Sequence, residues 1–126
     1  MSDPYKRDPA PGCDADAVTY AYQGTMRTRP GRRDEVVAIL LSGTAGLRAA
    51  GCHLYAVGVC ETDPDLVVVS ELWASKQHHD ASLELPETKA AIATAMPMLT
   101  GEFTGAEARV EGGLGVDVLT GAAARP

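Results

Sequence analysis

Four segments of the chain alternate between hydrophobic and polar positions, as a β-strand with one buried face does. They are residues 18–27, 53–61, 65–74 and 102–111. The third segment is the most strand-like, and a turn at residues 62–65 with Pro64 in it separates it from the second. These two strands are therefore expected to form a hairpin.

The alternation also predicts which side chains share a face of a strand. The first strand is expected to place Tyr20, Tyr22 and Met26 together, and the third strand Val67, Val69, Glu71 and Trp73. Gly24 interrupts the first strand. A glycine in mid-strand indicates either a bulge or another group that approaches the backbone closely.

Helical patterns fill the two longer gaps between strands. A helix is expected to begin near Asp34, where acidic residues favour the first turn, and to end at Gly51 in a left-handed conformation. Its apolar stripe consists of Val36, Leu40 and Leu47, with Ile39 beside them. Ser75 is expected to cap a second helix through residues 78–85, and Pro86 to start a further piece over residues 86–96.

The resulting order is β-α-β-β-α-β, which is the ferredoxin-like arrangement of an α+β domain with an antiparallel sheet. The chain has 126 residues, which fits one domain. We expect that domain to cover residues 17–111. Residues 1–16, which contain three prolines, are expected to be a flexible arm, and residues 112–126 a tail in which 114–119 could form a short strand.

The charge and the cysteines narrow the choice of partners. The formal net charge is -6 and the sequence pI is about 4.9, so we expect neither nucleic acid nor a membrane surface as a partner. The three cysteines have no CxxC spacing, which argues against a disulfide framework and against a metal site. The N-terminal residues lack the apolar segment of a secretory signal, and a cytoplasmic location is expected.

Four short motifs, in this order, resemble those of the antibiotic biosynthesis monooxygenase family. They are residues 30–35 at a strand-to-helix junction, the Gly-Cys-x-x-Tyr of residues 51–55, the Glu-x-Trp of residues 71–73 followed by Ser75, and Pro86 with an alanine-rich helix and then Met98-Leu99. The similarity extends over roughly residues 18–108. Each motif alone is weak, and their common order on matching elements makes the resemblance.

The resemblance implies a homodimer of the dimeric α/β-barrel type, in which two sheets pack face to face, with a pocket between sheet and helices in each subunit. Members of the family include cofactor-free oxygenases. We therefore expect a cofactor-independent monooxygenase that uses O2 on an aromatic, polyketide or quinol-type small molecule. The alternatives are a non-catalytic dimeric module that binds a small molecule or regulates, and, third, a haem-degrading oxygenase.

Two departures from the family pattern bear on the haem alternative. Characterised oxygenases of the family often carry an asparagine on the first strand, and this chain contains no asparagine. The position that matches the family's helix histidine is Ser82. Both differences argue against haem, so no cofactor is expected, and Ser82 is kept as a candidate substrate-binding residue.

Trp73 and Glu71 are the first candidates for chemistry. The indole N–H of Trp73 would hydrogen-bond a substrate oxygen while the ring stacks on the substrate, or Trp73 is a plain core residue. Glu71, on the same face, would have a raised pKa beside an apolar pocket and could deprotonate a phenol or quinol. The alternative for Glu71, which the sequence favours, is an ion pair at an interface or at the surface with an arginine such as Arg27.

Histidine and tyrosine supply the remaining candidates. His79 could act as a general base that reaches the pocket, although a solvated helix face is the more common environment. Adjacent His78 and His79 point in different directions on a helix and make a poor metal pair. Tyr20, Tyr22 and Tyr55 could line the pocket with hydroxyl donors, or pack as ordinary strand tyrosines.

Overall fold

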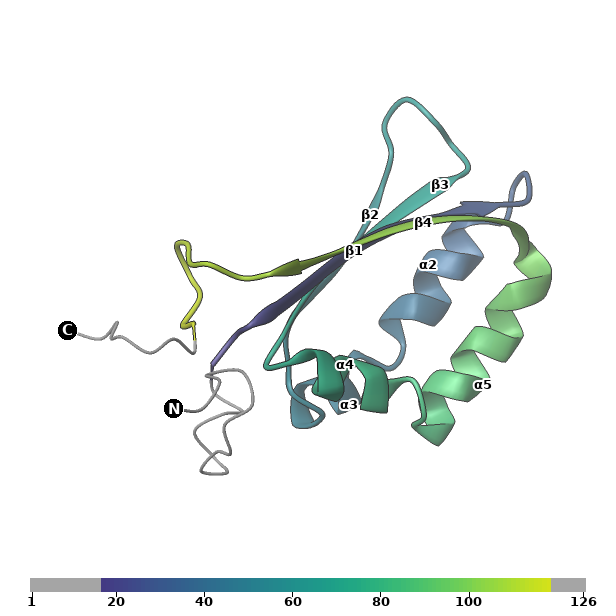
Figure 1. The fold of residues 1–126 in the computed structure, drawn as a ribbon. Coiled ribbons are helices and arrows are strands. Elements are labelled where there is room, and N and C mark those ends of the chain that lie inside the picture. The colour runs from purple at the N-terminus through teal and green to yellow at the C-terminus, as the bar shows by residue number, and fades with distance from the viewer. Residues whose placement is uncertain (1–16, 119–126) are drawn as a thin grey trace.

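The computed structural model of the chain describes residues 17–118, with four strands in one antiparallel sheet and the helices on one side of it (Figure 1). The strands are β1 (Tyr20–Thr28), β2 (Cys52–Val59), β3 (Leu66–Trp73) and β4 (Leu99–Arg109). The helices are α2 (Arg33–Leu41), α3 (Thr44–Ala49), α4 (Lys76–Ser82) and α5 (Pro86–Ala95), with a 3-10 turn, η1 (Met96–Met98), after α5. The strand order is β2-β3-β1-β4. The ferredoxin-like α+β fold is thus confirmed.

The predicted helix over residues 34–50 is wrong in one respect, because two helices stand in its place. The Ser42 hydroxyl donates to the carbonyl of Ile39 at 2.6 Å, and Gly43 follows it. Serine bonded to its own backbone and glycine both disfavour a continuing helix, so α2 ends and α3 starts afresh at Thr44. Gly51 has a φ of 104°, and it follows the end of α3 as predicted.

The predicted starts of the last two helices are confirmed. The Ser75 hydroxyl accepts a hydrogen bond from the backbone N–H of His78 at 3.1 Å, and Pro86 is the first residue of α5. The first of these helices ends at Ser82 rather than at residue 85. The last strand begins at Leu99, three residues before its predicted start, because η1 turns directly into it.

Gly24 marks a close approach. A Cβ built on it would lie 2.6 Å from the hydroxyl oxygen of Tyr22 and 2.8 Å from the carbonyl of Thr104. Gly105, its partner on β4, would meet the same hydroxyl at 2.6 Å. The ring of Tyr22 therefore lies over two paired glycines. The bulge lies elsewhere, between Met26 and Thr28.

The ends of the chain bear on two further predictions. Residues 1–16 and 119–126 lie outside the described residues, and with them the predicted arm and most of the predicted tail. Residues 114–118 form a turn and irregular backbone, so the short strand at 114–119 is wrong over this part. Gly113 and Gly115 have φ values of 147° and 89°, which a regular strand does not use.

Two clusters of buried side chains lie on the helix side of the sheet. The aliphatic cluster consists of Val36, Val67, Val69, Ala95 and Leu99. The aromatic cluster consists of Tyr20, Cys52 and Trp73. The opposite side, here called the open face, carries no helix (Figure 1). Within residues 17–118, no helix is long and apolar enough to cross a membrane.

Candidate functional site

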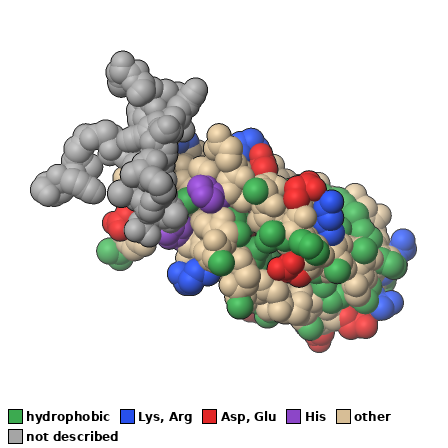
Figure 2. Space-filling model, turned by 90° about the horizontal axis from the view of Figure 1, so that it is seen from below, with side chains coloured by type: hydrophobic (Ala, Val, Ile, Leu, Met, Phe, Trp, Pro, Cys, Tyr) green, Lys and Arg blue, Asp and Glu red, His purple; other side chains and the backbone are tan. Residues whose placement is uncertain are grey.

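A pocket of about 410 Å³ lies between the sheet and the helices. Its lining is mostly aliphatic and aromatic, and it touches both buried clusters through Ala95, Leu99 and Trp73. Figure 2 shows hydrophobic side chains gathered on this side of the molecule, with acidic ones among them. The volume is in the range of small-molecule sites. The polar side chains of the lining are Ser42, Tyr55, Glu71, Trp73, His79, Ser82, Glu87 and Thr88.

The register of the sheet assembles the polar end of this pocket. Residues directly opposite each other on neighbouring strands have side chains on the same face. One row across β2, β3, β1 and β4 reads Tyr55, Glu71, Tyr22 and Glu107. The adjacent row reads Cys52, Trp73, Tyr20 and Arg109. The two named residues of the Glu-x-Trp motif, Glu71 and Trp73, are thus the β3 members of two adjacent rows on the same face of the sheet. The predicted faces of the first and third strands are confirmed.

Trp73 and Glu71 bind each other. The indole N–H of Trp73 donates to Oε1 of Glu71 at 2.7 Å, and Trp73 is 1% exposed. The donor expected to reach a substrate is therefore occupied by a carboxylate of the same strand. In the structure Trp73 is a buried residue that orients Glu71.

Arg27 does not pair with Glu71, so the particular partner that the sequence suggested is wrong. Arg27 binds Asp63 at 2.8 Å and Glu102 at 3.1 Å, at the hairpin end of the sheet. Its side chain also follows the alternation, which places residue 27 on the face opposite to Tyr22 and Met26.

Glu71 is a largely buried carboxylate, with a side chain 12% exposed. Burial raises the pKa of Glu71 above its usual value of 4.5, while the Trp73 hydrogen bond and nearby His79 oppose the rise. Raising the pKa of a carboxylate makes it a stronger base. The site therefore holds a carboxylate that is fixed in orientation and more basic than one on the surface.

His79 lies over this carboxylate and is not on a solvated helix face, contrary to the more common environment that the sequence favoured. Its side chain is 13% exposed, because α4 turns this side toward the sheet. Three rings surround the imidazole, with centroid distances of 5.2 Å to Tyr20, 5.6 Å to Tyr22 and 5.5 Å to Trp73. The arrangement fixes the plane of the His79 ring.

The two ring nitrogens of His79 face different carboxylates. Nε2 lies 3.9 Å from Oε1 of Glu71, and Nδ1 lies 2.9 Å from Oδ1 of the exposed Asp80. His79 therefore stands between a carboxylate in the pocket and one at the surface. His78 is placed differently, with Nδ1 2.6 Å from the Ser75 hydroxyl.

The three candidate tyrosines divide into two kinds. Tyr55 lines the pocket, and burial raises its pKa to about 12, so its hydroxyl stays protonated near neutral pH. Tyr20 and Tyr22 do not line the pocket and pack against His79 instead. Burial also raises the pKa of Tyr20 to about 12. Ser82 lines the pocket, but its hydroxyl already donates to the carbonyl of His79 at 2.6 Å.

Sequence reasoning missed Glu87 and Thr88, which line the pocket from the first turn of α5. Glu87 resembled an ordinary acidic residue at a helix start. Its Oε2 would lie 3.6 Å from a Cβ built on Gly46 of α3, so the carboxylate faces the neighbouring helix wall. Only the approach of the Glu87 side chain to Gly46 in the folded chain reveals this, and no pattern along the chain does.

Among residues 17–118, no group of three or more His, Cys, Asp and Glu side chains could hold a metal ion. The two described cysteines, Cys52 and Cys60, are both free thiols. Burial raises the pKa of the Cys52 thiol to about 11. The chemistry available in this part of the chain is thus that of a carboxylate, an imidazole and a phenol beside an apolar pocket.

Comparisons with known proteins agree with this arrangement. An antibiotic biosynthesis monooxygenase candidate from Chloroflexus aurantiacus is 37% identical, with a TM-score of 0.69 over 78% of this chain and 98% of that one. A monooxygenase candidate of the same description from Caulobacter crescentus is 22% identical, with a TM-score of 0.68 over 75% of this chain and 92% of that one. A Bacteroides thetaiotaomicron protein of unknown function is 14% identical, with a TM-score of 0.65 over 74% of this chain and 98% of that one.

The last two similarities show the fold alone. No curated protein sequence matches the chain. The family profile described as antibiotic biosynthesis monooxygenase matches residues 19–94, which is more than half of the chain. That family includes monooxygenases. By this match, and by the Chloroflexus relative, the chain belongs to the antibiotic biosynthesis monooxygenase family.

Proposed function

We propose that the protein is a cofactor-independent monooxygenase that oxidises an aromatic, polyketide or quinol-type small molecule with O2. The observation that carries the proposal is Glu71, a largely buried carboxylate of raised pKa at the polar end of an otherwise largely apolar pocket. Such a pocket can hold a flat ring system, and such a carboxylate can remove a proton from it. Family membership supports the same reaction class.

Deprotonation is the step that makes O2 chemistry accessible without a cofactor. A methylene between aromatic rings, as in an anthrone, loses one proton to Glu71 and becomes an electron-rich enolate. The enolate passes one electron to O2, and the resulting radical and superoxide combine into a carbon-bound peroxide anion. This anion takes the proton back from Glu71 and becomes a hydroperoxide. Loss of water then leaves a ketone, so CH2 and O2 become C=O and H2O. The substrate supplies all the electrons, and no reductant is needed.

The other polar residues would assist this proton transfer. Trp73 holds Glu71 in place through its 2.7 Å hydrogen bond. The Tyr55 hydroxyl, protonated because burial raises its pKa to about 12, can donate to a substrate oxygen that gains negative charge. His79, 3.9 Å from Glu71, can accept the proton when the side chains approach.

Oxygen uptake tests the proposal. The purified protein is incubated with an anthrone and with a series of substituted hydroquinones, while an electrode follows O2 and mass spectrometry follows the product. We expect one O2 consumed per substrate, with one atom of ¹⁸O2 in the product, and loss of both in Glu71→Gln. Binding of these compounds without oxidation would contradict the proposal and favour a non-catalytic binding module.

We also propose that the protein is a homodimer that covers the open face of the sheet with a second copy. Small or apolar side chains, Ala21, Ala106, Ala108, Val68 and Leu72, occupy the part of that face away from the Arg27 ion pairs. Leu54, beside Leu72 on β2, is 44% exposed. Two such faces can approach closely and bury these residues.

Light scattering should give twice the 13.2 kDa of one chain, and Leu54→Arg should shift the protein toward monomer. A 13.2 kDa particle at micromolar concentration would contradict this.

A further inference from the structure

We infer that the pocket selects uncharged substrates and rejects anions, so that the substrate is a phenol, quinol or anthrone without a carboxylate or phosphate group. The inference rests on the proposed function, since it concerns the same pocket. Its basis is the charge of the lining. Two carboxylates, Glu71 and Glu87, line the pocket, and no lysine or arginine of residues 17–118 does.

The two carboxylates act from opposite walls. Glu71 projects from β3 in the sheet, where its side chain is 12% exposed. Glu87 projects from the first turn of α5 and faces Gly46 of α3, on the helix side. A ligand between sheet and helices therefore has a carboxylate on each side of it. The charge of a bound anion would be repelled by both, more strongly by the largely buried Glu71 than by Glu87, which is exposed to water.

The basic residues near the pocket are engaged elsewhere. Lys76 lies 3.5 Å from Asp80 and 3.3 Å from Glu107, and Lys89 lies 3.0 Å from Glu84. Arg48 of α3 opposes the rise in the pKa of Cys52 but does not line the pocket.

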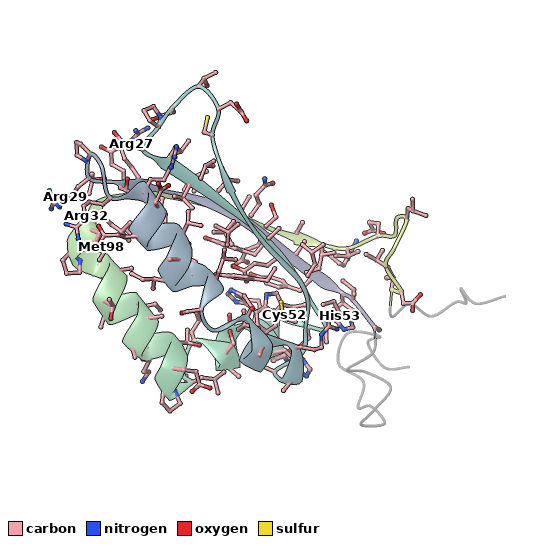
Figure 3. All side chains as sticks on the ribbon, turned by 180° about the vertical axis from the view of Figure 1, so that it is seen from behind. Arg27, Arg29, Arg32, Cys52, His53 and Met98 are labelled. Carbon is pink, nitrogen blue, oxygen red and sulfur yellow. The ribbon has the colours of Figure 1, made fainter. Side chains whose placement is uncertain are left out.

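A second group of basic residues, Arg27, Arg29 and Arg32, lies at the opposite end of the molecule from Cys52 (Figure 3). Two of these have carboxylate partners, since Arg27 binds Asp63 and Arg32 binds Glu35. Arg29 donates to the carbonyl of Pro97 at 3.1 Å. None of the three lines the pocket, so none offsets Glu71 and Glu87 there.

The neutral polar groups of the lining suit a hydroxyl better than an anion. The protonated Tyr55 can donate one hydrogen bond, while Glu71 can accept one. A phenol or enol presents one acceptor and one donor and matches this pair. A carboxylate needs several donors or a cation. The Ser42 and Ser82 hydroxyls of the lining already donate to backbone carbonyls, and the Trp73 N–H donates to Glu71, which leaves Tyr55, Thr88 and the His79 ring.

Calorimetric titration with matched ligands tests the selection. The ligands are 2-naphthol and 6-hydroxy-2-naphthoate, which share one ring system, and both are titrated into the full chain at pH 7. We expect the neutral naphthol to bind at least about tenfold more tightly than the carboxylate. Equal binding of the two, tighter binding of the carboxylate, or binding of neither would overturn the inference.

A matched pair of variants connects the selection to its cause. Glu87→Gln keeps the size of the side chain and removes its charge, and it should reduce the preference for naphthol at least about threefold. Glu84→Gln, three residues earlier and outside the lining, should leave the preference unchanged. An unchanged preference in Glu87→Gln, with a wild-type melting temperature, would overturn the role of Glu87. Oxygen uptake is not needed for these titrations, so failure of the proposed oxidation and failure of the charge selection give different results.

Discussion

The aliphatic and aromatic clusters lie beneath the same layer of helices, and they differ in the atoms that they bury. The aliphatic cluster, built around Val36, Val67 and Val69, contains no polar side-chain atom. The aromatic cluster contains the hydroxyl of Tyr20, the thiol of Cys52 and the indole N–H of Trp73, and it adjoins Glu71 and His79. The comparison indicates that the first cluster contributes apolar packing and, through Ala95 and Leu99, apolar lining, while the second surrounds the polar end of the pocket.

The protonation states sharpen this difference. Burial raises the pKa of Tyr20 to about 12 and that of Cys52 to about 11, so both groups stay neutral near pH 7. Glu71 is the group next to this cluster whose pKa is raised from 4.5 and which can carry a negative charge. The neutral surroundings leave that charge uncompensated except by Trp73 and His79. This keeps Glu71 basic at a cost in folding free energy.

The largest effect, on turnover, is expected when the charge of Glu71, beside the aromatic cluster, is removed. Glu71→Gln keeps the size and an acceptor for the Trp73 N–H but cannot take a proton. Turnover of an accepted anthrone or quinol should fall about 100-fold or more, as loss of a general base does. Steady-state oxygen uptake measures it, with Glu84→Gln as a control that should keep full activity. Retention of more than half of the turnover would exclude Glu71 as the base.

The same variant should also change how stability depends on pH. Because the folded-state pKa of Glu71 is raised, its contribution is fully present below about 4.5 and is lost as pH rises through the raised value. Glu71→Gln removes this loss. Denaturant unfolding from pH 4 to 8 should therefore show a gain in the stability of the variant over the wild type with rising pH. A constant difference across this range would contradict the raised pKa.

The next largest effect is expected in the aliphatic cluster, and on stability instead of turnover. Val67 is 0% exposed, and Val67→Ala should lower the free energy of unfolding by about 2 kcal/mol, through lost burial and a small cavity. Val59, its partner on β2, is 44% exposed, and Val59→Ala should cost less than about 0.5 kcal/mol. Urea titration measures both. A large loss of turnover in folded Val67→Ala would break the division between the clusters.

Much of the fold follows from the sequence because alternation in a strand is a local property. The faces of residues 18–27 and 65–74 fixed the two rows that contain Glu71 and Trp73. The broken helix could not be seen in the same way. The apolar stripe from Val36 to Leu47 continues across Ser42 and Gly43, and only the competing bond from Ser42 to Ile39 shows the interruption. A hydrophobic pattern constrains a face but not the continuity of the backbone.

The site could be predicted in part. The Glu-x-Trp spacing places both side chains on one face, but it does not tell whether Trp73 donates to a substrate or to Glu71. The burial of His79 depends on the orientation of α4 relative to β1 and β3. That orientation results from contacts between residues far apart in the sequence, such as those of His79 with Tyr20 and Trp73. The position of Glu87 in the pocket lining, near Gly46, likewise results from tertiary packing. A single sequence does not determine how helices are oriented on the sheet, and therefore does not determine which helix side chains enter the pocket.

The smallest of the expected effects concerns Trp73, which belongs to the aromatic cluster and bonds the charge beside it. Trp73→Phe keeps most of the apolar volume and removes the N–H that donates to Glu71 at 2.7 Å. That hydrogen bond opposes the rise in the pKa of Glu71, so its loss should raise the pKa further. Less of the base is then ionised at a given pH. We expect kcat/KM at acidic pH to fall up to about tenfold, with recovery as pH increases.

The pH profile of kcat/KM distinguishes this positioning role from direct contact with substrate. If Trp73 acts through Glu71, the acid limb of the profile should move to higher pH and the plateau should be nearly retained. If the indole N–H bound the substrate, the plateau itself should fall and the limb should stay in place. Tyr20→Phe is the matched control, because it removes a buried hydroxyl from the same cluster that has no hydrogen bond to Glu71. Its acid limb should coincide with that of the wild type, and a shift as large as that of Trp73→Phe would assign the effect to general disturbance of the cluster.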